Sequence, residues 1–301
     1  KQTASTDFYN GLGSLKGVDL TTASLGFTVI NTRGFNSTSP VRSLQTIDGV
    51  DNQSPGLNFS LGNFLGASEL DIQKVDLVVG ASSAFYGPNA FNGVIAMETK
   101  NPFFSKGLAA SVKVGERTLF ETGFRYADAI KNKSGKDFIG YKLNFSYLKA
   151  YDWVADNYDP VTDSEGNQVF SKPSDNPGGW DAVNIYGDQY SGSYSSLYDS
   201  RAGLNKFFFF FYKEVDLVDY NTKNIKAGAA IHFRTKPSKD FESPEIIIAS
   251  NFGYGTTVYQ GDNRFSLRGI QFYQQKIEFR KKDKFFIRAY ATNENAGDSF
   301  D

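Results

Sequence analysis

The side chains that could carry metal or catalytic chemistry are few and scattered in this sequence. His232 is the only histidine, and there is no cysteine. A protein zinc site takes three or four ligands, mostly of these two kinds. A lone imidazole on the polar face of a predicted strand therefore indicates an ordinary lumen side chain, and we predict no metal site.

Three further patterns fail to reach a recognised kind of active site. The acidic residues Asp156, Asp159, Asp163 and Glu165 miss the Asp-x-Asp-x-Asp-Gly spacing of calcium loops, which favours a solvated loop. The segment 80–87 lacks the Gly-x-Gly-x-x-Gly pattern and precedes no clear helix, so phosphate binding is not expected. No pair of carboxylates is placed by sequence for glycoside hydrolysis. We predict no enzyme, no catalytic residue and no cofactor.

The composition excludes one class of partner and favours one class of structure. The 32 basic and 33 acidic residues of the 301-residue chain nearly cancel, so charge gives no case for nucleic acid. The chain holds 28 phenylalanines, 17 tyrosines and 29 glycines. This bias favours strands and tight turns over helices.

Residues 32–100 contain short apolar runs separated by glycines 34, 49, 80, 87 and 93. This pattern is typical of a small, tightly turned mixed sheet. Around it we expect a short helix from Phe8 that ends near Gly17, a strand over 25–30, a helical turn over 68–71 and a strand over 74–79.

From about Pro102 the pattern changes to strict alternation of apolar and polar residues. Seven strands are predicted: 108–114, 120–126, 141–147, 225–233, 245–254, 272–281 and 285–292. Long links are expected over about 152–222 and 255–271, and the other links are short. A soluble antiparallel sandwich also alternates. Long strands with short turns at one side and long loops at the other favour a membrane β-barrel.

Two aromatic clusters fall inside the predicted long loop. Phe207–Phe211 is a run of five phenylalanines that we expect to be buried against a partner, a neighbouring loop or lipid. Trp153, Tyr158 and Trp180 are amphipathic aromatics that suit binding of sugars, peptides or a lid protein, and they equally suit simple packing of a long loop.

The N-terminal motifs, taken together, resemble the plug domain of TonB-dependent outer-membrane transporters. Order and spacing match over about 90 residues, which is more specific than any single motif. The matching runs are Leu15-Lys16-Gly17-Val18, Arg33-Gly34-Phe35, Asp48-Gly49-Val50, Gly80 with Ser83, Tyr86 and Gly87, Gly93-Val94-Ile95, and Thr99-Lys100. Where the family often has Arg-Ile-Glu-Val, this chain has Lys74-Val75-Asp76-Leu77. Arg33 is therefore the best candidate for the plug arginine that meets barrel glutamates.

The resemblance implies a mixed fold, with a small α/β plug over residues 1–103 and barrel strands over 104–301. Such barrels close with about 22 strands, so we expect this barrel to be incomplete and the chain to continue for several hundred residues. The implied ligand-facing plug loops contain Asn36, Ser37, Ser39, Asn52, Gln53, Asn58 and Phe59. The implied plug motif residues are Arg33, Gly34, Asp48, Gly49, Gly80, Tyr86, Gly87 and Gly93, and the external-loop aromatics are Trp153, Tyr158 and Trp180.

The function that the resemblance implies is TonB-dependent transport of an iron chelate, glycan, peptide or similar ligand across the outer membrane. The implied partners are TonB with its ExbB–ExbD motor, membrane lipid and, if the chain is of the Bacteroidota type, a SusD-like surface lipoprotein. The family's TonB box lies upstream of Lys1. Two alternatives stay open: a plug-barrel subunit that is structural and does not transport, and a soluble β-rich adhesin or sugar-binding module.

Overall fold

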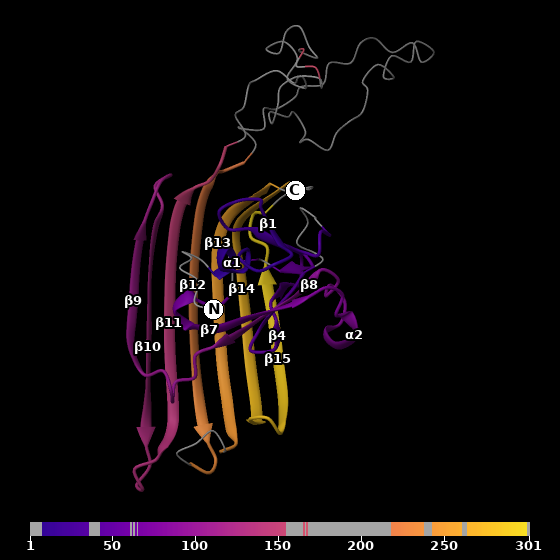
Figure 1. Cartoon of the computed structure of the whole chain (residues 1–301). Coiled ribbons are helices and arrows are strands. Elements are labelled where there is room, and N and C mark those ends of the chain that lie inside the picture. Colours follow the sequence, from indigo (N-terminus) through magenta and orange to yellow (C-terminus); the bar gives the residue numbers. More distant parts are fainter. Residues whose placement is uncertain are drawn as a thin grey trace, which may run out of the picture.

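A computed structural model describes residues 8–35, 43–60, 62, 64, 66–154, 165, 167, 218–237, 243–260 and 264–299 of the chain. They form a small N-terminal domain (residues 8–99) and a curved seven-stranded sheet (residues 107–295), shown in Figure 1. The N-terminal domain lies against one face of the sheet, which we call the inner face; the opposite face is the outer face. The predicted order, a small mixed domain followed by long antiparallel strands, is confirmed.

The N-terminal domain is built on a four-stranded mixed sheet in the order β4-β3-β8-β7. Its strands are β3 (Leu44–Ile47), β4 (Val50–Asp51), β7 (Ile72–Val79) and β8 (Gly93–Thr99). Strands β3 and β8 run parallel, and the other pairs are antiparallel. Two small hairpins complete the strands: β1 (Val18–Thr22) with β2 (Thr28–Thr32), and β5 (Gln53–Ser54) with β6 (Phe59–Ser60).

The helices of the N-terminal domain are short. They are α1 (Phe8–Leu12), the 3₁₀ turn η2 (Glu69–Asp71) and α2 (Ser83–Tyr86). Helix α1 ends earlier than predicted because Gly11 and Gly13 disfavour helix at this point. It packs its buried residues Tyr9 and Leu12 against strand residues such as Ile30 and Met97. No helix in the described part of the chain has the length and apolarity needed to cross a membrane.

The seven-stranded sheet is antiparallel and runs in sequence order. Its strands are β9 (Gly107–Val114), β10 (Phe120–Lys131), β11 (Asp137–Tyr151), β12 (Asn221–Arg234), β13 (Glu245–Gln260), β14 (Arg264–Lys281) and β15 (Phe285–Asn295). Every predicted strand is present. Strands β9 and β15 are the two edges, so the sheet is open.

The two faces of this sheet have the opposite polarity to that of a soluble protein. Outer-face residues are apolar and uncovered, such as Leu108 (71% exposed), Val112 (68%) and Ile287 (70%). Inner-face residues are polar and buried under the N-terminal domain, such as Arg125 (3%) and Glu278 (1%). The alternation in sequence thus separates an apolar outer face from a polar inner one.

One predicted connection is wrong. The segment 255–271 is not a long loop, because β13 extends to Gln260 and β14 begins at Arg264. The alternation is interrupted there by a register shift between Gly255 and Thr257 and by Gly269, whose φ is 65°. Beyond the shift, inner-face residues such as Tyr259 and Leu267 are buried and apolar, and they pack against the N-terminal domain.

Candidate functional site

The turn between β3 and β4 is the first place where the N-terminal domain meets the sheet. Asp48 and Gly49 form a two-residue hairpin turn in which both have positive φ angles, 50° and 73°. Asp-Gly suits this primed turn because each residue tolerates that conformation. The Asp48 carboxylate accepts hydrogen bonds from the Thr99 amide (2.8 Å) and hydroxyl (2.7 Å). The turn is therefore fixed to the end of β8.

Two basic residues of the sheet bind this turn. Lys276 Nζ lies 3.5 Å from the Asp48 carboxylate, and Arg288 donates a 2.7 Å hydrogen bond to the Gly49 carbonyl. The Arg288 guanidinium is held in turn by Glu278 at 2.6 Å. We call Asp48, Gly49, Lys276, Glu278 and Arg288 the Asp48 site. It joins β14 and β15 to the N-terminal domain.

A second polar contact centres on Asp71, at the end of η2. Its two carboxylate oxygens each lie 2.6 Å from a cation of the sheet, Arg125 Nε on one side and Lys142 Nζ on the other. All three side chains are at most 6% exposed. We call Asp71, Arg125 and Lys142 the Asp71 site. Because these side chains are buried, removal of one of them would leave the opposite charge without a partner and out of reach of water, which destabilises the fold.

Thr99 and Lys100 link the two sites. Lys142 Nζ donates to the Thr99 hydroxyl at 2.8 Å and to the Lys100 carbonyl at 3.0 Å, besides its pair with Asp71. The three donors of this ammonium group are thus all used. Because Thr99 also donates to Asp48, the Asp48 and Asp71 sites form one continuous network at the end of β8.

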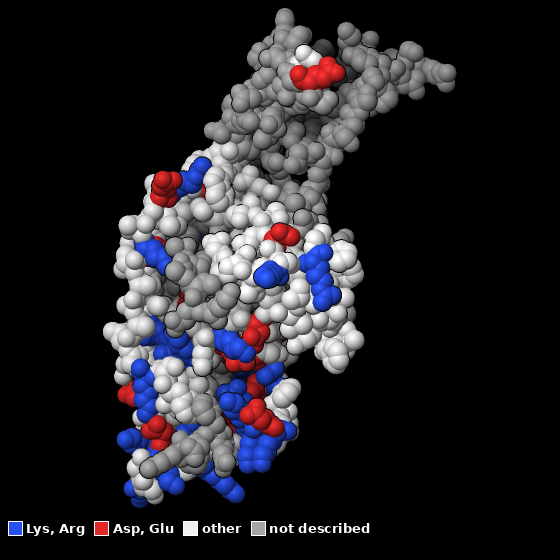
Figure 2. Space-filling view, viewed as in Figure 1, with Lys and Arg blue, Asp and Glu red and all other residues white. Residues whose placement is uncertain are grey.

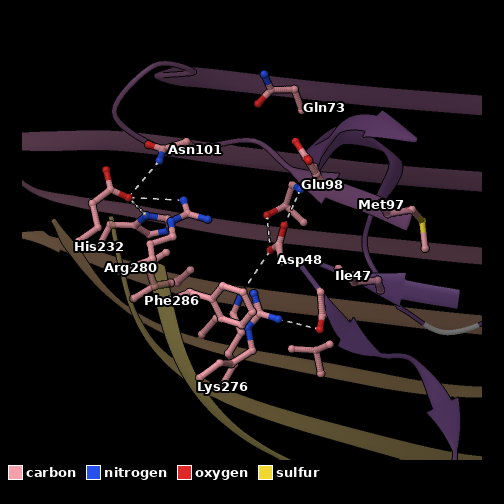
Figure 3. A pocket seen from close by; sticks show the side chains of 18 of the residues that line it. Ile47, Asp48, Gln73, Met97, Glu98, Asn101, His232, Lys276, Arg280 and Phe286 are labelled. Carbon is pink, nitrogen blue, oxygen red and sulfur yellow. Dashed lines mark hydrogen bonds and ion pairs between the residues drawn. The ribbon is translucent and has the colours of Figure 1, made fainter. Parts of the chain in front are cut away.

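A cavity of about 960 Å³ lies beside this network, between the β3–β8 edge of the N-terminal domain and the inner face of β11–β15. In Figure 3, Asp48 and Lys276 point toward one another on one side of it. On its other side Asn101, His232 and Arg280 converge on the Glu245 carboxylate, at 3.4, 3.6 and 3.5 Å. The lining is charged on both walls, which suits water and polar solutes.

An apolar contact holds the N-terminal domain at a third place. Phe27 and Phe64 pack with Tyr259, Leu267 and Phe272 of β13 and β14. The Phe64 ring lies directly over Gly255, where an added Cβ would come within 2.4 Å of it. Gly255 therefore makes a recess in the sheet that receives Phe64.

Two carboxylates of the sheet cap the backbone of the N-terminal domain. Glu294, near the end of β15, accepts from the Ser54 hydroxyl and from the Gly56 amide at 2.8 Å. Asp152, just after β11, accepts from the Leu25 amide at 3.1 and 3.2 Å. Both lie at the end of the sheet from which the long β11–β12 connection leaves (Figure 1). The loop over 52–59 is thus held at that end.

That Arg33 meets barrel glutamates stays a prediction. Its exposed side chain lies beside Gly80, whose added Cβ would be 2.7 Å from the guanidinium, and within the described residues it forms no ion pair with a glutamate of the seven strands. The ion pairs of the Asp48 and Asp71 sites join acidic residues of the N-terminal domain to basic residues of the sheet. The sequence reading did not single out Arg125, Lys142, Lys276 or Arg288 as site residues, although alternation put Arg125 and Lys142 on the polar face.

The other predicted site residues are spread over the N-terminal domain. Gly34, Gly80, Gly87 and Gly93 have positive φ angles, and Tyr86 is 45% exposed at the end of α2.

The residues proposed to face the ligand differ in exposure. Asn52 is buried (1%), the Gln53 carboxamide accepts a hydrogen bond from Asn89, Asn58 is exposed, and Phe59 begins β6. Trp153 is 42% exposed and lies under Arg117. Outside the described residues are Asn36, Ser37, Ser39, Tyr158, Trp180 and Phe207–Phe211.

Gly49→Ala will disturb the Asp48 site more than a change of backbone preference alone would. A positive φ costs an alanine roughly 1–2 kcal/mol, and the new methyl would also lie 2.4 Å from the Arg288 guanidinium. Gly34→Ala is the matched control, with the same φ of 73° and no atom within 4 Å of its added Cβ. Thermal unfolding of both variants checks this; an equal loss in both would contradict a close contact at Gly49.

The stability given by Asp48 will depend on pH. Burial would raise the pKa of its carboxyl, but Lys276, Lys142 and the two hydrogen bonds from Thr99 outweigh it and lower the pKa from 3.8 to about 2. A lowered pKa stabilises the folded state fully above pH 3.8, and the contribution is lost as the pH falls toward about 2. It amounts to about 2 kcal/mol.

Asp48→Asn tests this pH dependence. We expect the variant to be less stable than the natural protein at pH 6, and the difference to shrink as the pH approaches 2. Denaturant unfolding at a series of pH values measures it. A difference that stayed constant over this range would show that ionisation of Asp48 does not stabilise the fold.

The comparisons agree with this geometry. Residues 1–94 match the model of the TonB-dependent Receptor Plug Domain family. A structure titled ferric enterobactin receptor PfeA, from Pseudomonas aeruginosa, superposes with a TM-score of 0.54 at 15% identity, over 96% of this chain and 38% of its own. The copper transporter OprC superposes with a TM-score of 0.53 at 14% identity, over 93% of this chain and 33% of its own.

This chain therefore spans little more than a third of the length of these two proteins. Identities of 14% and 15% establish the shared fold and nothing finer. Residues 1–94 are a TonB-dependent receptor plug domain, and the chain has the fold of that plug followed by part of the receptor barrel.

Proposed function

We propose that this chain is the gating part of a TonB-dependent transporter in the outer membrane. The observation that carries the proposal is the reversed polarity of the seven-stranded sheet, whose apolar face is uncovered and whose polar face is filled by the N-terminal domain. An uncovered apolar face suits lipid, and a polar face suits an aqueous lumen. Unpaired sheet edges are not stable in lipid, so further strands complete the barrel.

The N-terminal domain acts as the plug of that lumen, and we place its boundary at residues 103 and 104. This is supported by the connection between β8 and β9, where Arg234 lies 4.0 Å from the centre of the Phe103 ring. The connection is thus anchored to the sheet, while the strands before it can shift. The charged cavity beside the Asp48 site offers room for such a shift.

Opening requires force because the plug is held by the Asp71 site, the Asp48 site and the Phe64 contact. Each is local, so a pull that reaches one of them can break it without unfolding the rest. TonB, driven by its ExbB–ExbD motor, supplies that pull through a segment upstream of the plug. The two sites share Thr99, so loss of one weakens the other.

The ligand is an iron chelate, a glycan, a peptide or a similar solute too large for passive diffusion. The names of the similar structures, a copper transporter and a ferric enterobactin receptor, favour a metal or metal chelate. The exposed Asn58 and the half-exposed Trp153 are proposed contacts. A SusD-like lipoprotein over the long β11–β12 connection would instead favour glycans or peptides.

Uptake by cells that express the full receptor tests transport. We expect one member of a panel of labelled ferric chelates, oligosaccharides and peptides to accumulate, and accumulation to stop in cells that lack TonB. The same loss is expected when the segment upstream of Lys1 is deleted while receptor abundance stays normal. Accumulation that continued without TonB would contradict energised transport and favour a structural subunit.

Membrane placement has its own test. The receptor should sediment with outer membranes and require detergent for extraction. Recovery of folded receptor in buffer without detergent would contradict a lipid-facing outer surface and favour a soluble β-rich binding protein.

A further inference from the structure

One end of the seven-stranded sheet carries a concentration of lysines. The connections β10–β11, β12–β13 and β14–β15 all lie there, at the lower end in Figure 1, and we call their described residues 131–137, 235–237 and 281–284 the turn end. It holds two acidic residues, Asp137 and Asp283, against seven lysines: Lys131, Lys133, Lys136, Lys236, Lys281, Lys282 and Lys284. Figure 2 shows basic side chains gathered over this part of the molecule.

Among the described residues, the opposite end of the sheet carries no such excess of lysine. Glu116 stands next to Arg117 in the β9–β10 connection, and Asp152 and Asp219 flank a register pair of lysines, Lys149 and Lys223. The excess of lysine is therefore a property of one end. It is not explained by a general need for solubility, which both ends would share.

Two of the turns that carry these lysines, β10–β11 and β14–β15, are fixed by hydrogen bonds. In the first turn, the Asn132 carboxamide accepts from the amides of Ser134 and Lys136, both at 3.0 Å. In the third, the Lys284 amide donates to the Lys281 carbonyl at 3.1 Å. Asp137, one of the two acids, is engaged by Lys106 at 2.8 Å. Each of these two turns carries three lysines within seven residues or fewer, and the repulsion among like charges favours a bound anion.

The apolar outer face reaches directly to these lysines. Ile130, 55% exposed, precedes Lys131 in the chain. Phe279 and Phe285 form an edge-on pair with centroids 5.4 Å apart, and Lys281 follows Phe279 by two residues on the same face of β14. Exposed apolar and aromatic residues bounded by lysine mark the depth at which acyl chains give way to headgroups.

We propose that the turn end binds the phosphate groups of anionic phospholipids in the leaflet that it reaches. The inference rests on the proposed function, which places the outer face in lipid. Ammonium groups attract anionic headgroups within a Debye length of the surface. The anion is a lipid and not an acidic protein because Lys281 and Lys131 adjoin the apolar outer face.

The test uses the full receptor in phosphatidylcholine vesicles that contain a trace of spin-labelled lipid. The label is carried on phosphatidylglycerol in one sample and on phosphatidylcholine in the other, and electron paramagnetic resonance gives the fraction immobilised by the protein. We expect the phosphatidylglycerol label to be favoured about fivefold or more in 0.05 M salt. The preference should decline in 0.5 M salt.

The triple variant Lys131→Gln/Lys133→Gln/Lys281→Gln removes three turn-end charges. It should bring the ratio of phosphatidylglycerol to phosphatidylcholine association close to one. Lys16→Gln/Lys74→Gln removes positive charge from exposed positions of the N-terminal domain, away from the outer face, and should leave it unchanged. Equal association of the two lipids with the natural receptor, or a preference that the first variant keeps, would overturn the proposal. Salt-dependent binding of polyglutamate to a receptor without lipid preference would assign the surface to an acidic protein. If neither label were immobilised, the membrane placement itself would be wrong.

Discussion

Asp71→Asn will make the backbone amides of β7 and β8 exchange with solvent roughly 100-fold faster or more than in the natural receptor. The substitution leaves Arg125 and Lys142 buried without their counter-charge, which costs about 3–5 kcal/mol. Each 1.4 kcal/mol is about tenfold in an opening equilibrium. Native-state hydrogen exchange on the full receptor in detergent measures the effect, and leakage of small hydrophilic solutes should rise with it.

Asp76→Asn is the matched control for this experiment. Asp76 also pairs with a lysine, Lys74, but both side chains are about half exposed, 45% and 57%. Exposed pairs contribute under about 1 kcal/mol, so exchange should change only a few-fold. Similar rates in the two variants would show that the Asp71 site does not hold the plug. Replacing all three charges by apolar residues, Asp71→Leu/Arg125→Met/Lys142→Met, should restore slow exchange.

Phe64→Ala will release the upper part of the plug from β13 and β14. The Phe64 ring is 1% exposed and fills the recess over Gly255, so its removal leaves a cavity between the plug and the sheet. Loss of a buried phenylalanine costs about 3–5 kcal/mol. Faster exchange of the amides of β2 and a lower unfolding temperature are the expected results.

Phe85→Ala removes the same side chain from α2, where it is 91% exposed, and should be nearly neutral. A small effect of Phe64→Ala would mean that the plug is retained by its ion pairs alone. Gly255→Val is a further check, because the valine side chain would occupy the recess and displace the Phe64 ring. Its effect should resemble that of Phe64→Ala.

The local patterns of the sequence were reliable where one face of a strand meets water or lipid and the other meets the plug. The alternation over 225–233 predicted β12 and put Lys226, His232 and Arg234 on the polar face, where they are buried. It failed over 255–271, where the register shifts between Gly255 and Thr257 and Gly269 has a positive φ of 65°. Alternation can be read along a strand only while the register is continuous, and a β-bulge interrupts it.

The ion pairs could not be read from the sequence in the same way. Asp71 meets Arg125 and Lys142 across 54 and 71 residues, and Arg288 meets Gly49 across 239. Many charges stand on the polar face, and their partners depend on how the plug is rotated against the sheet. Arg33 was chosen by resemblance; in the structure it lies beside Gly80, and its contact with barrel glutamates stays a prediction.

The sequence by itself determined the order of the two parts, the seven strands with their two faces, and the glycine-rich turns, because each depends on residues close together in the chain. The tertiary structure alone decided which charges meet, where Phe64 inserts and where a cavity remains. These features depend on how the N-terminal domain packs against the seven-stranded sheet. That packing is determined by many weak contacts between residues far apart in the chain.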